Sequence, residues 1–268
     1  MSLSPFFLIN RHKKSKNYLV IYKNLTIKSM KVAQKIWQDL LSLFYPDLCL
    51  ACKEVLVGNE NCICTNCLYE LPKTDYHRIP QQNEVCTKFW GKVPIHYGLA
   101  YLFFRKSTAV QQLMFALKYQ GQADVGLFLG ELFGRELYKA GFTQQGEYGT
   151  FDAILPIPLH PRKEAKRGYN QSAYFAQGLS AGLQVAVRAD ILVRKIETQT
   201  QTQKDRLQRF ENMKSVFAIE NRESIVGKHL LLVDDVITTG ATLESALHLL
   251  LENGAAKVSV GAIAVAAR

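Results

Sequence analysis

The chain has 268 residues and a formal net charge of +10, with 48% hydrophobic and 21% charged residues, the balance of an ordinary soluble globular protein. Its longest nearly apolar run, residues 258–267, is too short for a membrane-spanning helix, so we expect no membrane span. The length allows one large domain and a small module. The basic surplus favours polyanionic partners such as nucleic acid or phosphorylated small molecules.

The basic surplus is concentrated near the N-terminus, where residues 1–48 hold eight Lys and Arg against two acids. Residues 1–30 show no periodicity, and we expect a solvated, disordered extension with Met30 as the true start. The apolar residues 5–9 come before the basic run 11–16, the reverse of a secretory signal peptide, so we expect a cytoplasmic protein. Residues 31–45 place apolar side chains at helical spacing, which predicts a helix that Pro46 ends.

Five of the six cysteines fall between residues 49 and 67, which in a reducing compartment indicates a metal site rather than disulfides. The spacing C-x2-C-x11-C-x2-C forms two knuckles whose four thiolates suit one tetrahedral, structural Zn2+ ion. The predicted zinc ligands are Cys49, Cys52, Cys64 and Cys67. Cys62 could compete with Cys64, and His77 or His96 could substitute for a thiolate. Residues 46–95 hold too few apolar side chains for a core of their own, so a metal would stabilise this module.

Short apolar runs alternate with amphipathic stretches in the rest of the chain. Strands are predicted at 100–104, 151–158, 229–233 and 257–266, and helices at 107–119 with Ser107 as N-cap, 123–139, 170–182 and 242–252. This alternation favours an α/β fold with a mostly parallel sheet and helices on both faces. We therefore expect a basic extension at 1–30, a helix and zinc module at 31–95, and an α/β domain at 96–268.

The segment HLLLVDDVITTGATLESALHLL carries the strongest functional signal. A buried strand leads into Asp234 and Asp235, at the edge where parallel sheets place ligands, and paired carboxylates there suit the hydroxyls of a ribose. The small-residue turn before the next helix offers hydroxyls and backbone N–H groups to a phosphate. That turn consists of Thr238, Thr239, Gly240, Ala241 and Thr242. The plainer interpretation is an acidic strand end that caps a helix.

Two polar segments complete the predicted site. The loop after strand 151–158 holds Arg162, Lys163, Lys166 and Arg167, and arginine binds phosphate oxygens in bidentate fashion; alternatively this is a basic surface loop. Residues 197–212 are polar and have no apolar face, so we predict a mobile loop there, or else a plain linker. Its candidate contact residues are Thr198, Gln201, Arg209 and Asn212.

Several motifs in this order resemble the ComF family. They are the cysteine pairs, LKYQG at 117–121, RGYNQ at 167–171, the T-x-x-Q…R-x-x-N…F pattern at 198–217, and DDVITTGAT at 234–242. The resemblance covers about residues 31–268. Some relatives have a third C-x2-C pair, but here Phe89 stands where the partner of Cys86 would be. We therefore expect one zinc site, formed by the first two cysteine pairs, and no second site at Cys86.

The resemblance implies the type I phosphoribosyltransferase fold and a site for 5-phosphoribosyl-1-pyrophosphate (PRPP) with Mg2+. Asp234 and Asp235 would be the catalytic pair that contacts the ribose hydroxyls, and the turn 238–242 would hold the 5-phosphate. Arg162 and Arg167 would stabilise the pyrophosphate, and the polar segment would close over the site.

The same resemblance implies two roles. One is phosphoribosyltransferase activity, a glycosyltransferase reaction that moves a pentosyl group. The other is DNA uptake during natural competence, beside a competence helicase and in contact with single-stranded DNA. The alternative is a non-catalytic protein that uses the same phosphate site to bind nucleic acid or a helicase partner.

Overall fold

The computed structural model describes residues 45–105, 108–195 and 216–266. The extension predicted at 1–30, the helix predicted at 31–45 (apart from its last residue) and the polar segment 197–212 lie outside these ranges.

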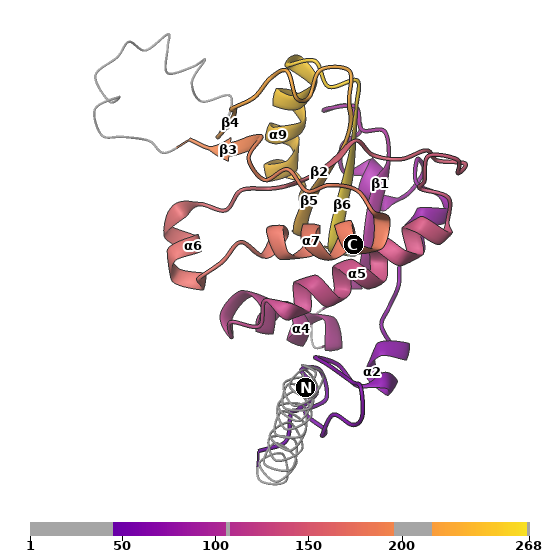
Figure 1. The fold of residues 1–268 in the computed structure, drawn as a ribbon, viewed down its shortest axis with the longest axis vertical. Helices are drawn as coiled ribbons and strands as arrows, with labels where there is room; N and C mark the ends of the chain where they lie inside the picture. Colours follow the sequence, from indigo (N-terminus) through magenta and orange to yellow (C-terminus); the bar gives the residue numbers. More distant parts are fainter. Residues whose placement is uncertain (1–44, 106–107, 196–215, 267–268) are drawn as a thin grey trace, which may run out of the picture.

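A four-stranded parallel sheet forms the centre of the molecule, in the order β1-β6-β5-β2 (Figure 1). Its strands are β1 (Gly98–Phe104), β2 (Ala153–Pro156), β5 (His229–Ile237) and β6 (Lys257–Ala266). The predicted parallel sheet is confirmed. However, the strand predicted at 229–233 continues for four more residues, so that Asp234 and Asp235 lie within β5 rather than after it.

Helices cover both faces of the sheet, as predicted, because successive residues of each strand point to opposite sides. On β5, Leu231 and Val233 join the apolar cluster formed with α4 (Ala109–Tyr119), α5 (Asp124–Lys139) and α7 (Gln171–Leu183). Leu230 and Leu232 join the cluster formed with α9 (Ala241–Glu252). Each face of the sheet therefore has its own core.

Glycines bring α5 and α7 into backbone contact. A Cβ built on Gly178 would lie 2.1 Å from the carbonyl oxygen of Leu127, and one built on Gly130 would lie 2.4 Å from that of Phe175. The spacing places a glycine every fourth residue, on one side of each helix. The glycines are Gly126, Gly130 and Gly134 on α5, and Gly178 and Gly182 on α7.

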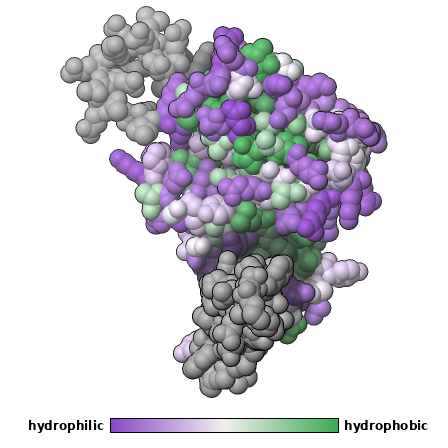
Figure 2. Space-filling view, viewed as in Figure 1, coloured by the Kyte–Doolittle hydropathy of each residue, from purple (hydrophilic) through white to green (hydrophobic). Residues whose placement is uncertain are grey.

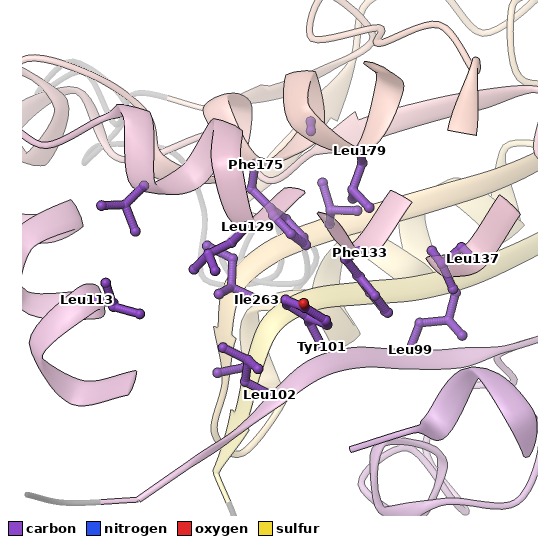
Figure 3. Close-up of a cluster of buried hydrophobic side chains, with 14 of the residues drawn as sticks. Leu99, Tyr101, Leu102, Leu113, Leu129, Phe133, Leu137, Phe175, Leu179 and Ile263 are labelled. Carbon is purple, nitrogen blue, oxygen red and sulfur yellow. The ribbon is translucent and has the colours of Figure 1, made fainter. Parts of the chain in front are cut away.

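Bulky side chains of the same two helices fill the space above the sheet (Figure 3). Phe133 of α5 stacks on Tyr101 of β1 with ring centroids 5.2 Å apart. Phe175 and Leu179 of α7 are completely buried in the same cluster. The glycines thus allow the close approach, and the aromatic and leucine side chains supply the apolar burial.

Three predicted elements differ in the structure. The helix predicted from Ser107 begins at Ala109 with Thr108 as N-cap. The basic segment predicted as a loop forms the short helix α6 (Pro161–Arg167), because the His160 ring accepts a hydrogen bond from the Arg162 N–H at its start and Gly168 adopts φ +84° at its end. On either side of the polar segment, residues with no predicted strand form a separate antiparallel ladder, β3 (Leu192–Arg194) with β4 (Phe217–Ile219).

The segment 65–95, which begins within the second cysteine pair, packs on the α/β unit. It contains α2 (Thr65–Tyr69), the 3-10 turn η1 (Tyr76–Arg78) and α3 (Glu84–Thr87). The Thr74 N–H donates to the Tyr101 carbonyl at 3.0 Å, and the Gly98 N–H donates to the Pro80 carbonyl at 2.8 Å. Val85 and Phe89 are buried in the α9-side core. Residues 72–95 therefore share the second core of the sheet.

Hydrophilic side chains cover most of the face drawn in Figure 2, with apolar patches between them. Within the described ranges, no helix has the length and apolar content needed to cross a membrane.

The glycine contact yields a stability prediction. Alanine favours a helix by about 1 kcal/mol over glycine, but a Cβ at Gly178 would overlap the Leu127 carbonyl at 2.1 Å. Overlap of this kind costs about 3 kcal/mol, so we expect Gly178→Ala to lower the free energy of unfolding by about 2 kcal/mol. Chemical denaturation would measure it. The control is Gln177→Ala on the exposed side of α7, which should change little, and a stabilised Gly178→Ala protein would contradict the close contact.

Candidate ligand site and metal centre

The acidic pair lies on β5 near the carboxyl edge of the sheet. Asp234 Oδ1 accepts a hydrogen bond from the Ser172 hydroxyl at 2.9 Å and another from the Asp235 N–H at 2.8 Å. Burial, reinforced by the negative charge of Asp235, raises the pKa of Asp234 to about 7. Ser172 is buried in the first turn of α7, whose N-cap is Asn170. The first carboxylate is thus desolvated and held by two donors.

Asp235 forms an ion pair with Lys118, which comes from the last turn of α4. The Nζ–Oδ1 distance is 3.0 Å, and the side chains of Lys118 and Asp235 are 23% and 14% exposed. Sequence analysis placed Lys118 in the LKYQG motif without a role. The position of Lys118 near the end of a predicted helix was only weak evidence for a site residue, because the helix dipole alone favours basic residues there.

The residues predicted to form a phosphate turn lie between β5 and α9 and in the first turn of α9. Thr238 and Thr239 are exposed, Gly240 is the N-cap at φ +83°, and α9 starts at Ala241. The Thr239 hydroxyl accepts from the Ala241 N–H at 3.4 Å. Ala241 and Thr242 therefore belong to the first helical turn, where backbone N–H groups point out of the helix toward an anion.

Phe89 and Lys92 brace this turn from the segment that follows the cysteines. A Cβ on Gly240 would lie 3.1 Å from the Phe89 ring, so both the positive φ and the close packing require glycine there. Lys92 pairs with Glu244 in the first turn of α9 at 3.3 Å. Sequence analysis treated Phe89 only as the residue in place of a cysteine, whereas the structure gives it a core position against the turn.

The two predicted pyrophosphate residues lie in different settings. Arg167 donates to Gln171 Oε1 at 2.8 Å and its guanidinium lies 5.5 Å from the centre of the Tyr119 ring. Arg167 is therefore held beside the end of α4, against Tyr119, which directly follows Lys118 in the sequence. Arg162 is exposed on α6, which stands out from the body of the domain (Figure 1).

The four predicted metal ligands are brought together. The sulfur atoms of Cys49, Cys52, Cys64 and Cys67 all lie within 4.8 Å of one another. Tetrahedral zinc with Zn–S bonds of about 2.3 Å needs sulfur separations of about 3.8 Å, so this donor set fits a metal such as zinc. Cys62 and the two histidines are outside this cluster.

The metal cluster lies at the start of α4. Cys52, Cys67 and Thr108 line one pocket, and Thr108 is the N-cap of α4. Cys86 is buried elsewhere, with its sulfur 3.3 Å from the Pro80 carbonyl oxygen. The cluster therefore touches the helix whose other end carries Lys118.

The cluster predicts one structural zinc ion per chain. We expect elemental analysis of freshly purified protein to give a zinc-to-protein ratio of about 1, and Cys52→Ser to lower that ratio and the thermal midpoint. Cys62→Ser is the matched control, because Cys62 lies outside the cluster, and it should keep its zinc. Zinc loss from both variants, or no zinc in the parent protein, would refute the assignment.

The raised pKa of Asp234 predicts that the folded protein loses stability as the pH rises. Since the folded-state pKa of about 7 exceeds the ordinary value of 3.8, stability that is present below about pH 4 is lost as the pH rises through 7. Asp234→Asn removes the charge, and its amide oxygen can accept both hydrogen bonds made by Oδ1.

We therefore expect the stability advantage of Asp234→Asn over the wild type to be larger at about pH 8 than at about pH 5, by about 2 to 3 kcal/mol. Denaturant titrations at both pH values would measure the difference. Asp235→Asn is the control and should destabilise, because Lys118 loses its partner. A gain for Asp234→Asn that is equal at the two pH values would contradict the burial argument.

Comparison with known proteins adds three findings. A family model described as "Phosphoribosyl transferase domain" matches residues 170–268. DNA utilization protein YhgH of Escherichia coli (strain K12) is 30% identical over 225 residues, which cover 81% of this chain and 96% of that protein. Competence protein F of Haemophilus influenzae is 27% identical over 233 residues, which cover 82% of this chain and 98% of that protein.

Among solved structures, the glutamine PRPP amidotransferase from B. subtilis in complex with ADP and GMP is 18% identical to the chain. It has a TM-score of 0.40, and the match covers 56% of this chain and 30% of that one.

The family match begins at Asn170, the N-cap of α7, and so takes in Ser172, the acidic pair and the turn before α9. The match to YhgH spans nearly the whole of that protein, and the parallel sheet with flanking helices is the architecture expected from the sequence. The chain therefore belongs to the ComF family and carries a phosphoribosyltransferase domain of the type I fold behind a four-cysteine module.

Proposed function

We propose that the domain binds PRPP together with Mg2+ at the junction of β5 and α9. The observation that carries the proposal is the half-buried acidic pair on β5, followed within a few residues by a glycine-capped helix start. Carboxylates accept hydrogen bonds from a ribose diol, and a helix N-terminus attracts a phosphate. One ribose 5-phosphate satisfies both preferences.

Each chemical group of PRPP has a counterpart among these residues. The turn 238–242 would hold the 5-phosphate through its N–H groups and threonine hydroxyls. Asp234 and Asp235 would accept the ribose hydroxyls. Arg167, beside the end of α4, and Arg162, on α6, would contact the pyrophosphate. Bound Mg2+ would neutralise the pyrophosphate oxygens.

The same arrangement suits phosphoribosyl transfer. In that reaction an acceptor nitrogen or oxygen forms a bond to the anomeric carbon of the ribose as the bond from that carbon to the pyrophosphate oxygen breaks. Pyrophosphate leaves with the electron pair, and the acceptor gives up its proton to solvent. The protein's part is to orient the ribose through Asp235 and Asp234 and to stabilise the leaving group electrostatically.

A second candidate function is binding of single-stranded DNA during DNA uptake, beside a competence helicase. It is favoured by the net charge of +10 and by the names of the relatives, DNA utilization protein and competence protein F. Arg162, Lys163 and Lys166 are exposed on α6, where they could reach a nucleic-acid backbone. The 5-phosphate of a DNA strand would then take the place of the 5-phosphate of PRPP.

Calorimetric titration with PRPP and Mg2+ tests the proposal. We expect saturable binding with about one site per chain, and at least about 100-fold weaker binding by the Asp234→Asn/Asp235→Asn variant, since two charged hydrogen-bond acceptors are lost. Asp190→Asn is the matched control, because Asp190 pairs with Arg188 at the surface and should not affect binding.

Wild-type protein that does not bind PRPP would overturn the proposal. A mobility shift with short single strands at about 50 mM salt, where phosphate contacts are strongest, would then test the second function. If DNA uses the same turn, PRPP should displace it.

A further inference from the structure

We propose that Lys118 is a positioning residue for the acidic pair: it holds the Asp235 side chain oriented so that the carboxylate can accept a ribose hydroxyl. This inference rests on the proposed binding of PRPP. It assigns a role to a side chain that lies 117 residues away from its partner along the chain.

The end of α4 is fixed in place, so the position of Lys118 is defined by the fold. The Tyr169 hydroxyl donates to the Leu117 carbonyl, and Leu117 is fully buried. The Arg167 guanidinium lies over the Tyr119 ring at 5.5 Å from its centroid. The residues on both sides of Lys118 are thus tied to the segment that joins α6 and α7.

Charge balance requires a cation near Asp235. Two adjacent carboxylates would repel a ligand that carries several phosphate charges. The Lys118 ammonium lies 3.0 Å from Asp235 Oδ1, with both side chains largely shielded from water. Because water screens such a pair only weakly, the ion pair reduces the negative charge of the site and restrains the Asp235 carboxylate.

The ion pair leaves one carboxylate oxygen of Asp235 available to accept a hydrogen bond from the ligand. The ion pair uses Oδ1, so Oδ2 can accept a hydroxyl while Lys118 stays in contact. A direct role of Lys118 as a pyrophosphate ligand would instead require this ion pair to break. The positioning role would affect binding of the ribose, whereas a direct role would affect binding of the pyrophosphate, so the test compares these two parts of the ligand.

The test is a double-mutant cycle of Lys118→Met and Asp235→Asn, measured calorimetrically with three probes in the presence of Mg2+: PRPP, ribose 5-phosphate and pyrophosphate. We expect Lys118→Met to weaken PRPP and ribose 5-phosphate alike, by about tenfold, and to leave pyrophosphate unchanged. In the Asp235→Asn background the same change should cost less than about twofold. Lys118→Arg should stay within about threefold of the wild type, because the charge is kept.

The matched control is Lys73→Met, since Lys73 pairs with Glu136 across the surface of another part of the domain, and its binding should equal that of the wild type. Thermal melts accompany every variant. Should Lys118→Met not fold, Lys118→Gln takes its place in the cycle.

The outcomes distinguish a failure of the Lys118 positioning role from a failure of the proposed PRPP binding. If the wild type binds PRPP and Lys118→Met binds it equally well, the positioning role is wrong and the proposed function stands. Weaker pyrophosphate binding with ribose 5-phosphate unchanged would make Lys118 a direct pyrophosphate ligand and would also overturn the positioning role. If the wild type binds neither PRPP nor ribose 5-phosphate, the proposed function fails and the inference fails with it.

Discussion

The backbone contact between α5 and α7 is the constraint on which the site depends. Gly178 approaches the Leu127 carbonyl so closely that even a methyl group would overlap it. This contact fixes where α7 begins, and the first turn of α7 carries Ser172 to Asp234 at 2.9 Å. A shift of about 1 Å in α7 would break that hydrogen bond, since such bonds require distances near 2.8 Å. The backbone contact made by glycines between α5 and α7 thus sets the position of Ser172 relative to Asp234.

Charge burial is the second feature that shapes the site. Asp234 is kept in surroundings that raise its pKa to about 7, which costs stability in the ligand-free protein, and Asp235 is balanced by Lys118 at 3.0 Å. A ligand that brings hydroxyl donors and Mg2+ would offset this cost. Under the proposed function, the stability cost at Asp234 would serve ligand binding, as expected where stability and activity conflict.

Local sequence patterns predicted the strands, the turn before α9 and the grouping of four cysteines well, because each depends on neighbouring residues. The apolar run before Asp234 fixes β5, Gly240 marks the start of α9, and paired cysteines mark the knuckles. The extent of β5 was wrong, since strand pairing with β6 continues through Asp234 to Ile237. Lys118, Ser172 and Phe89 were missed as site residues, because each reaches the site through tertiary packing across long stretches of chain. Glycine spacing on α5 and α7 was the available signal for their close contact.

A crystal structure of the protein with PRPP and Mg2+ tests the central claim most directly. The account predicts the 5-phosphate against the N–H groups at the start of α9, the ribose hydroxyls on Asp234 and Asp235, and the Lys118–Asp235 ion pair intact. Density for the ligand elsewhere on the domain, or a ribose that does not contact the acidic pair, would contradict it.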